Sequence, residues 1–194
     1  MKTLIISLAF CLVAIWGLAV PPKAGVRANC PYPNGTDTKI HVYNCGDTWP
    51  LMVKDAVVYD DKNNTMYPID PRKPMVLDLI SVNNGVAYQD NKVNVSIFDY
   101  AADWITGDCK WSEISTFGLL NNIDGCQFAH NCPLQTGDLN LMLPLNLTQF
   151  AAIINSLTSG RPYQLQVKMF DYNPGSGHEQ IACVISQLKF EEKN

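Results

Sequence analysis

The sequence predicts an all-β domain, a two-sheet antiparallel sandwich with one short helix, and three observations support this. Of the seven cysteines, Cys11 lies in an apolar leader and six remain; an even number in a secreted chain is typical of a disulfide framework. Short runs rich in β-branched and aromatic residues are separated by turn signals. Three of these runs alternate between apolar and polar residues, as strands do when one face is buried and the other is in water.

Residues 1–19 are predicted to be a secretory signal peptide. Lys2 supplies a positive charge, an uncharged apolar run follows over residues 4–20, and cleavage is expected after Ala19. A signal anchor that stays in the membrane is the alternative, but the run is near the lower length limit of a spanning helix.

The rest of the chain suits one domain. Residues 20–39, rich in Pro, Gly and Asn, are expected to form an irregular arm, and residues 40–190 the folded domain. The formal net charge of −4 is mild and no basic stripe is present, which argues against nucleic acid as a partner.

Six runs are predicted to be strands, at residues 53–59, 75–82, 92–100, 139–147, 163–172 and 180–190. Asn83-Asn84-Gly85 is a tight-turn signal after the second run, and Asn173-Pro174-Gly175 joins the last two as a hairpin.

Four glycosylation signals, at Asn34, Asn63, Asn94 and Asn146, predict asparagines that reach solvent and carry glycans. Side chains alternate across a strand, so an outward Asn94 or Asn146 turns the aliphatic residues at odd positions of its strand inward. The same alternation holds in residues 163–172. The predicted inner apolar face consists of Val93, Val95, Ile97, Leu139, Leu141, Leu143, Leu165 and Val167.

One segment has the periodicity of a helix. Apolar residues recur at i, i+3, i+4 and i+7, namely at Phe150, Ile153, Ile154 and Leu157. Thr148 is a candidate N-cap and Gly160 a candidate end. The helix either packs on the edge of the sandwich or flanks the mouth of a cavity.

Residues 100–132 lack sustained strand alternation, yet they are rich in apolar side chains and contain three cysteines. Long connections are usually functional or disordered, and this one is too apolar and too cross-linked to be disordered. Its side chains either close an ordinary core or line the opening of a cavity. Together with the helical segment, it supplies the residues predicted for a cavity mouth and for membrane contact: Trp104, Ile105, Trp111, Phe117, Leu119, Leu120, Ile153 and Ile154.

No catalytic residue, metal or cofactor is predicted. The histidines are far apart in the sequence, at His41, His130 and His178, and no Gly-x-Ser-x-Gly motif accompanies them. Cys126 and Cys132 are close, but no histidine pair at ligand spacing completes a zinc site. Carboxylate pairs such as Asp60-Asp61, which a glycosidase would need in a cleft, are expected to be solvated.

Cys126-Gln-Phe-Ala-His-Asn-Cys132-Pro133-Leu134, followed by Gly137 and the strand at 139–145, resembles the ML lipid-recognition family. Residues 43–47, Tyr-Asn-Cys-Gly-Asp, resemble the opening element of that family, and residues 181–185, Ile-Ala-Cys-Val-Ile, its closing strand. The resemblance covers residues 40–190. It implies an immunoglobulin-like sandwich whose two antiparallel sheets splay apart around an apolar, lipid-binding cavity.

The resemblance also implies disulfides. The first-to-last bridge of the family corresponds to Cys45–Cys183 and its short loop bridge to Cys126–Cys132, which leaves Cys30–Cys109. The pattern of the ganglioside activator branch would instead pair Cys109 with Cys132 and Cys30 with Cys126.

The function implied by the resemblance is that of a non-enzymatic carrier that extracts and presents a glycolipid or related lipid, closest to the ganglioside activator and lysosomal cholesterol carrier branches. The implied partners are a lipid (glycolipid, phospholipid or sterol), a membrane surface in transient contact, and a lipid hydrolase that the carrier activates. The leader, cysteines and glycosylation signals predict a secreted or lysosomal protein. The alternatives are a sterol or fatty-acid carrier of the same fold, a secreted immunoglobulin-like module that recognises a protein, and a hydrolase.

Overall fold

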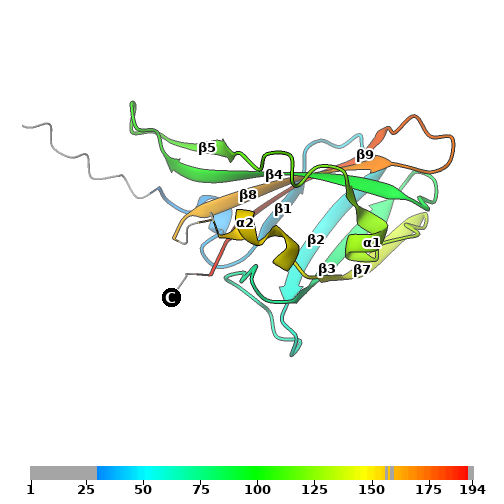
Figure 1. The fold of residues 1–194 in the computed structure, drawn as a ribbon, viewed down its shortest axis with the longest axis horizontal. Helices are drawn as coiled ribbons and strands as arrows, with labels where there is room; N and C mark the ends of the chain where they lie inside the picture. The colour runs from blue at the N-terminus through cyan, green and yellow to red at the C-terminus, as the bar shows by residue number, and fades with distance from the viewer. Residues whose placement is uncertain (1–29, 156, 158–159, 192–194) are drawn as a thin grey trace, which may run out of the picture.

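The protein forms two antiparallel sheets that lie face to face (Figure 1). The computed structural model describes residues 30–155, 157 and 160–191. The predicted signal peptide and the first half of the predicted arm lie outside these residues. Within the described part, no helix has the length and apolarity needed to cross a bilayer. The architecture is the all-β sandwich that the sequence predicts.

The larger sheet has the strand order β1 (His41–Asn44), β9 (Gln180–Lys189), β8 (Pro162–Asp171), β4 (Asn91–Ala102) and β5 (Cys109–Ile114), with β6 (Ile123–Asp124) paired to the start of β4. The smaller sheet has the order β2 (Leu51–Tyr59), β3 (Met75–Asn83) and β7 (Gly137–Leu145). The predicted hairpin of the last two runs is the antiparallel pair β8–β9.

The six predicted strands are present, and their ends differ from the prediction by at most two residues. Three strands were not predicted: β1, and also β5 and β6, which lie within residues 100–132, where the sequence lacks sustained strand alternation. Among the described residues, β5 is an edge strand that pairs with β4 alone, and it forms because of this pairing, as in Tyr100 with Trp111. Pairing with a neighbour outweighs the residue pattern at such a position.

The predicted helix is shorter than expected. It consists of a 3-10 turn, η2 (Thr148–Phe150), followed by α2 (Ala151–Ile154). Thr148 begins η2 and does not cap it; instead, Asn146 Oδ1 accepts hydrogen bonds from the Thr148 backbone N–H at 3.1 Å and from its hydroxyl at 2.8 Å.

Two further helical elements are too short for the sequence periodicity to show. The helix α1 (Gly125–Ala129) is capped by Asp124, whose side chain accepts a hydrogen bond from the Gln127 backbone N–H at 2.9 Å. A 3-10 turn, η1 (Pro33–Gly35), lies in the predicted irregular arm.

Three disulfides cross-link the fold: Cys30–Cys109, Cys45–Cys183 and Cys126–Cys132. They tie the start of the described chain to β5, the end of β1 to β9, and the two ends of the α1 segment to each other. The pairing implied for the ganglioside activator branch does not occur. Three disulfides fit an extracellular or lysosomal protein.

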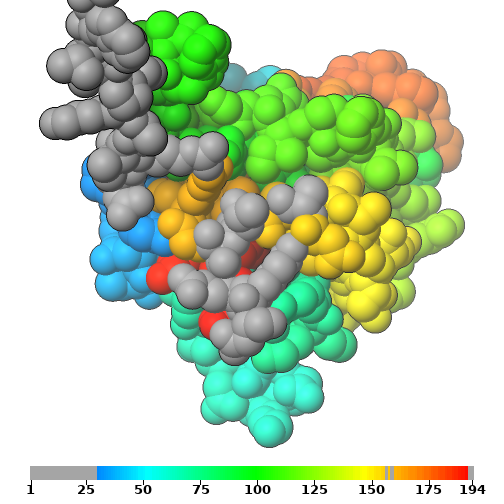
Figure 2. Space-filling view, turned by 60° about the vertical axis from the view of Figure 1, so that its left-hand side comes forward, coloured from blue at the N-terminus to red at the C-terminus, as the bar shows by residue number. Residues whose placement is uncertain are grey.

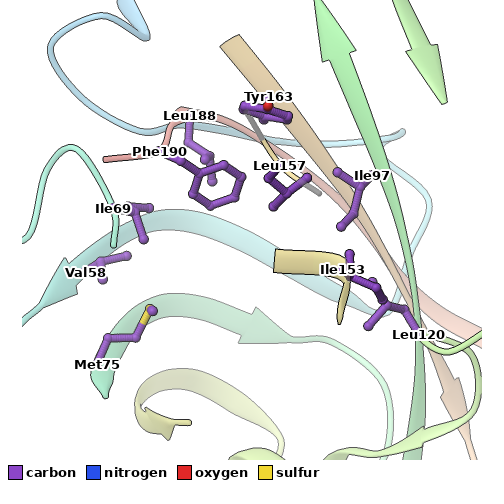
Figure 3. Close-up of a cluster of buried hydrophobic side chains, with 10 residues drawn as sticks. All are labelled: Val58, Ile69, Met75, Ile97, Leu120, Ile153, Leu157, Tyr163, Leu188 and Phe190. Carbon is purple, nitrogen blue, oxygen red and sulfur yellow. The ribbon is translucent and has the colours of Figure 1, made fainter. Parts of the chain in front are cut away.

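Most of the buried apolar side chains that the structure describes belong to one of two clusters. The larger one, shown in Figure 3, lies between the sheets and contains Val58, Ile69, Met75, Ile97, Leu120, Ile153, Leu157, Tyr163, Leu188 and Phe190. The smaller one contains Leu51, Tyr88, Leu134, Ile181 and Ala182. The two sheets are therefore held together at separate places.

Candidate functional site

A cavity of about 320 Å³ lies between the two sheets. Both sheets contribute to its wall, for example through Leu77 of β3, Leu165 of β8 and Val184 of β9. Asn131 and Ser186 are the only polar side chains among the described residues that line it. The cavity is therefore suited to hydrocarbon.

The structure places six of the eight residues predicted for the inner face on the cavity wall: Val93, Val95, Ile97, Leu143, Leu165 and Val167. Leu139 and Leu141 do not border the cavity, because they pack against the smaller buried cluster. Tyr88 and Leu134 of that cluster are almost completely buried, and they fill the space between the sheets at this end.

Other lining residues were not singled out from the sequence. They include Val53 and Val58 of β2 and Ala182 and Leu188 of β9. Glycosylation signals indicated which way β4 and β7 face, but β2 and β9 carry none. In addition, residues 181–185 are apolar on both faces of β9, so alternation alone does not reveal the inner face.

The connection between β7 and β8 covers part of the cavity. Five of its apolar side chains line the wall: Leu147, Phe150, Ile153, Ile154 and Leu157. Figure 3 shows Ile153 and Leu157 among the side chains buried between the sheets. Ile153 and Ile154 are buried, so the prediction that they contact a membrane is not supported by their position. At the end of the connection, Arg161 Nη1 lies 2.9 Å from Asp99 Oδ2 of β4.

Four large apolar side chains flank the edge strand β5 on the surface. Trp104 and Ile105, in the turn before β5, are 90% and 72% exposed. Phe117 and Leu119, in the connection after β5, are 90% and 57% exposed. The β4–β5 hairpin projects beyond the body of the sandwich (Figure 1). We refer to these four side chains, two before β5 and two after it, as the β5 apolar edge.

Two residues predicted for the same surface lie elsewhere. Trp111 of β5 packs against Tyr100, with ring centroids 4.9 Å apart. Leu120 is buried and lines the cavity, and its backbone carbonyl accepts a hydrogen bond from the Val95 N–H at 2.9 Å. The connection after β5 therefore contacts water through Leu119 and the cavity through Leu120.

Asp103 shapes the turn that carries Trp104 and Ile105. Its Oδ1 accepts hydrogen bonds from the backbone N–H groups of Ile105, at 2.8 Å, and Thr106, at 3.1 Å. Its other carboxylate oxygen forms an ion pair with Lys110. The Lys110 ammonium and these two N–H groups lower the pKa of Asp103 to about 2.

We expect this turn to keep its charge in an acidic compartment. Because the pKa of Asp103 is below its ordinary value of 3.8, its contribution to stability is complete above about pH 4 and is lost as the pH falls towards 2. Carbon-13 NMR titration of the carboxyl group should give a midpoint near 2. Substitution Lys110→Ala should raise it; a midpoint that stays in place would contradict the assigned cause.

A wider groove of about 830 Å³ adjoins the cavity, and we call it the rim groove. Met75, Ile123, Phe128 and Leu145 border both spaces. Its polar lining residues are Asp61, Asp124, Gln127, His130, Asn146, Thr148 and Gln149. In Figure 2 the yellow-green and yellow segments that contribute most of these residues lie side by side on one face of the molecule.

The glycosylation signals lie at or near the surface. Asn34, Asn63 and Asn146 are exposed, and Asn94 is half-buried on the outer face of β4, opposite the cavity-lining Val95. Asn34 Nδ2, the atom that a glycan would modify, donates a hydrogen bond to Gln187 Oε1 at 2.7 Å. Asn146 borders the rim groove.

One cluster of possible metal ligands exists in the described part of the chain, formed by Asp90, Asp124 and Cys126. The sulfur of Cys126 is bonded to Cys132, so it offers no thiolate to a metal. The three histidines lie on separate elements: His41 on β1, His130 at the end of α1 and His178 in the β8–β9 turn.

Comparisons with known proteins give little beyond the architecture. No protein-family model matches the chain, and no curated protein matches it. A solved structure described as "Crystal structure of the C-terminal domain of wzt" is similar at a TM-score of 0.35 and 11% sequence identity, over 82% of this chain and 83% of that one. A likeness of this size says nothing about function.

Proposed function

We propose that this protein is a lipid-binding and transfer protein without a catalytic step of its own, as the resemblance to the ML family implies. The hydrocarbon part of the lipid occupies the cavity between the sheets, and the polar head stays at the rim. The observation that carries the proposal is the size and apolar lining of the cavity.

The first argument concerns the packing contacts that the side chains around the cavity do not make. Apolar side chains that border an unfilled space lack packing partners on that side and lose the dispersion contacts that a close-packed core makes. A hydrocarbon ligand would recover part of these contacts, which gives the folded protein a physical reason to bind one.

The second argument concerns transfer. Moving a chain of about sixteen carbons from a membrane into water costs roughly 13 kcal/mol, at about 0.8 kcal/mol per methylene. Such a chain exchanges too slowly without help. An apolar cavity offsets this cost, and the β5 apolar edge supplies a surface that can enter the headgroup region of a bilayer.

The volume limits the cargo. An aliphatic cavity of about 150 Å³ holds one benzene, so 320 Å³ accommodates roughly twelve carbon atoms. We therefore propose a single acyl or alkyl chain as the part that fits the cavity. A longer chain, a second chain or a sterol would extend beyond it.

Native mass spectrometry of gently purified protein tests the proposal, and we expect an added mass that corresponds to a lipid. Adding that lipid at a hundred times its dissociation constant should stabilise the fold by about 2.7 kcal/mol in thermal unfolding. Absence of bound lipid, together with no stabilisation by a lysophospholipid, a fatty acid, a sterol or a glycolipid, would contradict it.

The same measurements separate the alternatives. The added mass distinguishes a glycolipid carrier from a carrier of sterols or fatty acids. A module that recognises another protein would not be stabilised by any lipid, and a hydrolase would convert lipid or sugar substrates in turnover assays. Activation of a partner lipid hydrolase, and a secreted or lysosomal location, are further parts of the proposal.

A further inference from the structure

We infer that the rim groove selects an uncharged, hydroxyl-rich lipid head and disfavours an anionic one. The inference rests on the proposed function, because it assigns a headgroup class to the same binding site.

The first step is geometric. The rim groove and the cavity share four bordering side chains, Met75, Ile123, Phe128 and Leu145. A lipid whose chain occupies the cavity and leaves it on this side therefore places its head in the groove. The groove volume of about 830 Å³ exceeds that of the cavity, so a bulky head is accommodated.

The second step is the charge of the groove. The lining residues that can carry charge are Asp61, Asp124 and His130, and no lysine or arginine is among the lining residues that the structure describes. Lys92 Nζ lies 3.9 Å from Asp124 Oδ2, but Lys92 is not a lining residue and is positioned over the ring of Tyr172. An anionic head in the groove would face carboxylates without a lining ammonium or guanidinium group to bind it.

Two other lysines are next to lining residues in the sequence. Lys73 Nζ is 3.3 Å from Asp70 Oδ2, so it is engaged outside the groove. Lys62 adjoins Asp61, is exposed, and does not line the groove. Neither lysine therefore adds a positive charge to the groove lining that a bound headgroup would contact.

The third step is hydrogen bonding. The side chains of Gln127, Thr148 and Gln149 are exposed at the groove. Amide and hydroxyl groups both donate and accept hydrogen bonds, as the hydroxyl groups of a sugar or polyol do. The lining is therefore complementary to an uncharged head that offers several hydroxyl groups.

Two ligands with the same twelve-carbon alkyl chain test the inference: dodecyl glucoside, which is uncharged, and tridecanoate, whose carboxylate is anionic. Both are titrated below their micelle concentrations at pH 7 by calorimetry. Repulsion from two carboxylates at moderate distance predicts about tenfold tighter binding of the glucoside. The protein is produced in a bacterial periplasm, which forms disulfides and attaches no N-glycan at these signals, so that a glycan at Asn146 does not contribute and the groove keeps its side chains.

Gln127 provides a matched pair of variants. It is exposed, and its backbone N–H rather than its side chain bonds to the capping Asp124, so that cap is retained in both. Gln127→Lys should raise the ratio of tridecanoate affinity to glucoside affinity about fivefold, and Gln127→Glu should lower it.

The outcomes distinguish the two proposals. If the protein binds both ligands equally, or if the two Gln127 variants give the same ratio, the headgroup inference is wrong while lipid carriage stands. If neither ligand binds, the proposed function fails and the inference fails with it.

Discussion

Substitution of Val95 by aspartate is expected to lower lipid binding and vesicle-to-vesicle transfer by more than about a hundredfold. Val95 lies on β4, lines the cavity and pairs across the sheet with Val167, which also lines it. A carboxylate at this position must either stay ionised beside hydrocarbon, which costs several kcal/mol, or bind a proton. Whether it is ionised or protonated, the carboxyl group is polar and lies on the part of the cavity wall that would contact the hydrocarbon chain of the ligand.

The matched control is Gln166→Asp. Gln166 precedes Val167 on β8 and, by strand alternation, lies on the opposite face of the sheet. The transfer rate of Gln166→Asp should stay within about twofold of that of the unsubstituted protein, because this face of β8 points away from the cavity. By contrast, Leu141→Asp is not a test of the cavity, because Leu141 packs against the smaller buried cluster.

A second variant keeps this prediction testable if Val95→Asp does not fold. Val167→Phe adds apolar volume to the cavity wall without adding charge, so the fold should tolerate it better. It should shorten the longest alkyl chain that binds tightly, measured with a series of alkyl glucosides. Normal transfer by folded Val95→Asp would show that lipid does not occupy the cavity. If Val95→Asp does not fold, an unchanged chain-length limit in Val167→Phe would show the same.

Phe117→Asn is expected to stabilise the fold while weakening its binding to membranes. Phe117 has φ 52° and Gly118 φ 76°, and the Leu119 N–H donates to the Thr116 carbonyl at 3.0 Å, so the two form the centre of a type I′ turn. A bulky aromatic residue at positive φ is an outlier that costs of order 1 kcal/mol or more, whereas asparagine is favoured there. We expect a gain of about 1 kcal/mol in the free energy of unfolding.

The weaker membrane binding follows from the side chain. Phe117 is 90% exposed in water, and burying a phenylalanine side chain is worth about 1.5–3 kcal/mol. Its loss should reduce affinity for phosphatidylcholine vesicles at least about tenfold, measured by co-sedimentation. Binding of dodecyl glucoside from solution should change less than binding to vesicles.

Val86→Asn is the control for the β5 apolar edge. Val86 is an exposed apolar residue in the β3–β4 connection, remote in sequence from β5. It should leave vesicle affinity unchanged. If Phe117→Asn binds vesicles as well as the unsubstituted protein, or if Val86→Asn weakens binding equally, the β5 apolar edge is not the membrane contact.

Most strands were predictable because their signals are local. Alternation of apolar and polar residues and the turn at Asn173-Pro174-Gly175 depend only on neighbours in the chain, so they identified β8 and β9. The side of β4 that points inward was predicted from one residue, Asn94, because its neighbour Val95 must then point the other way; Val95 lies on the cavity wall. β5 was missed because it is an edge strand that depends on its pairing with β4.

The candidate site was only partly predictable, for the same reason. Trp104 and Trp111 look alike in sequence, yet Trp104 projects from a turn while Trp111 packs on Tyr100. The helical periodicity revealed that Ile153 and Ile154 share a face but not what that face covers. The rim groove combines residues from the connection after β2, from β3, from α1 and from the end of β7, and no local pattern connects them.

By itself the sequence determined the class of fold, the positions of the main strands and the direction in which several of them face. Backbone geometry imposes these properties on each strand separately. Only the tertiary structure decided that the inward-facing side chains of the two sheets surround a cavity. Leu139 and Leu143 alternate identically along β7, but Leu143 meets the cavity while Leu139 meets side chains packed around Leu134. The separation of two sheets depends on contacts between residues distant in the chain, so alternation within one strand does not reveal it.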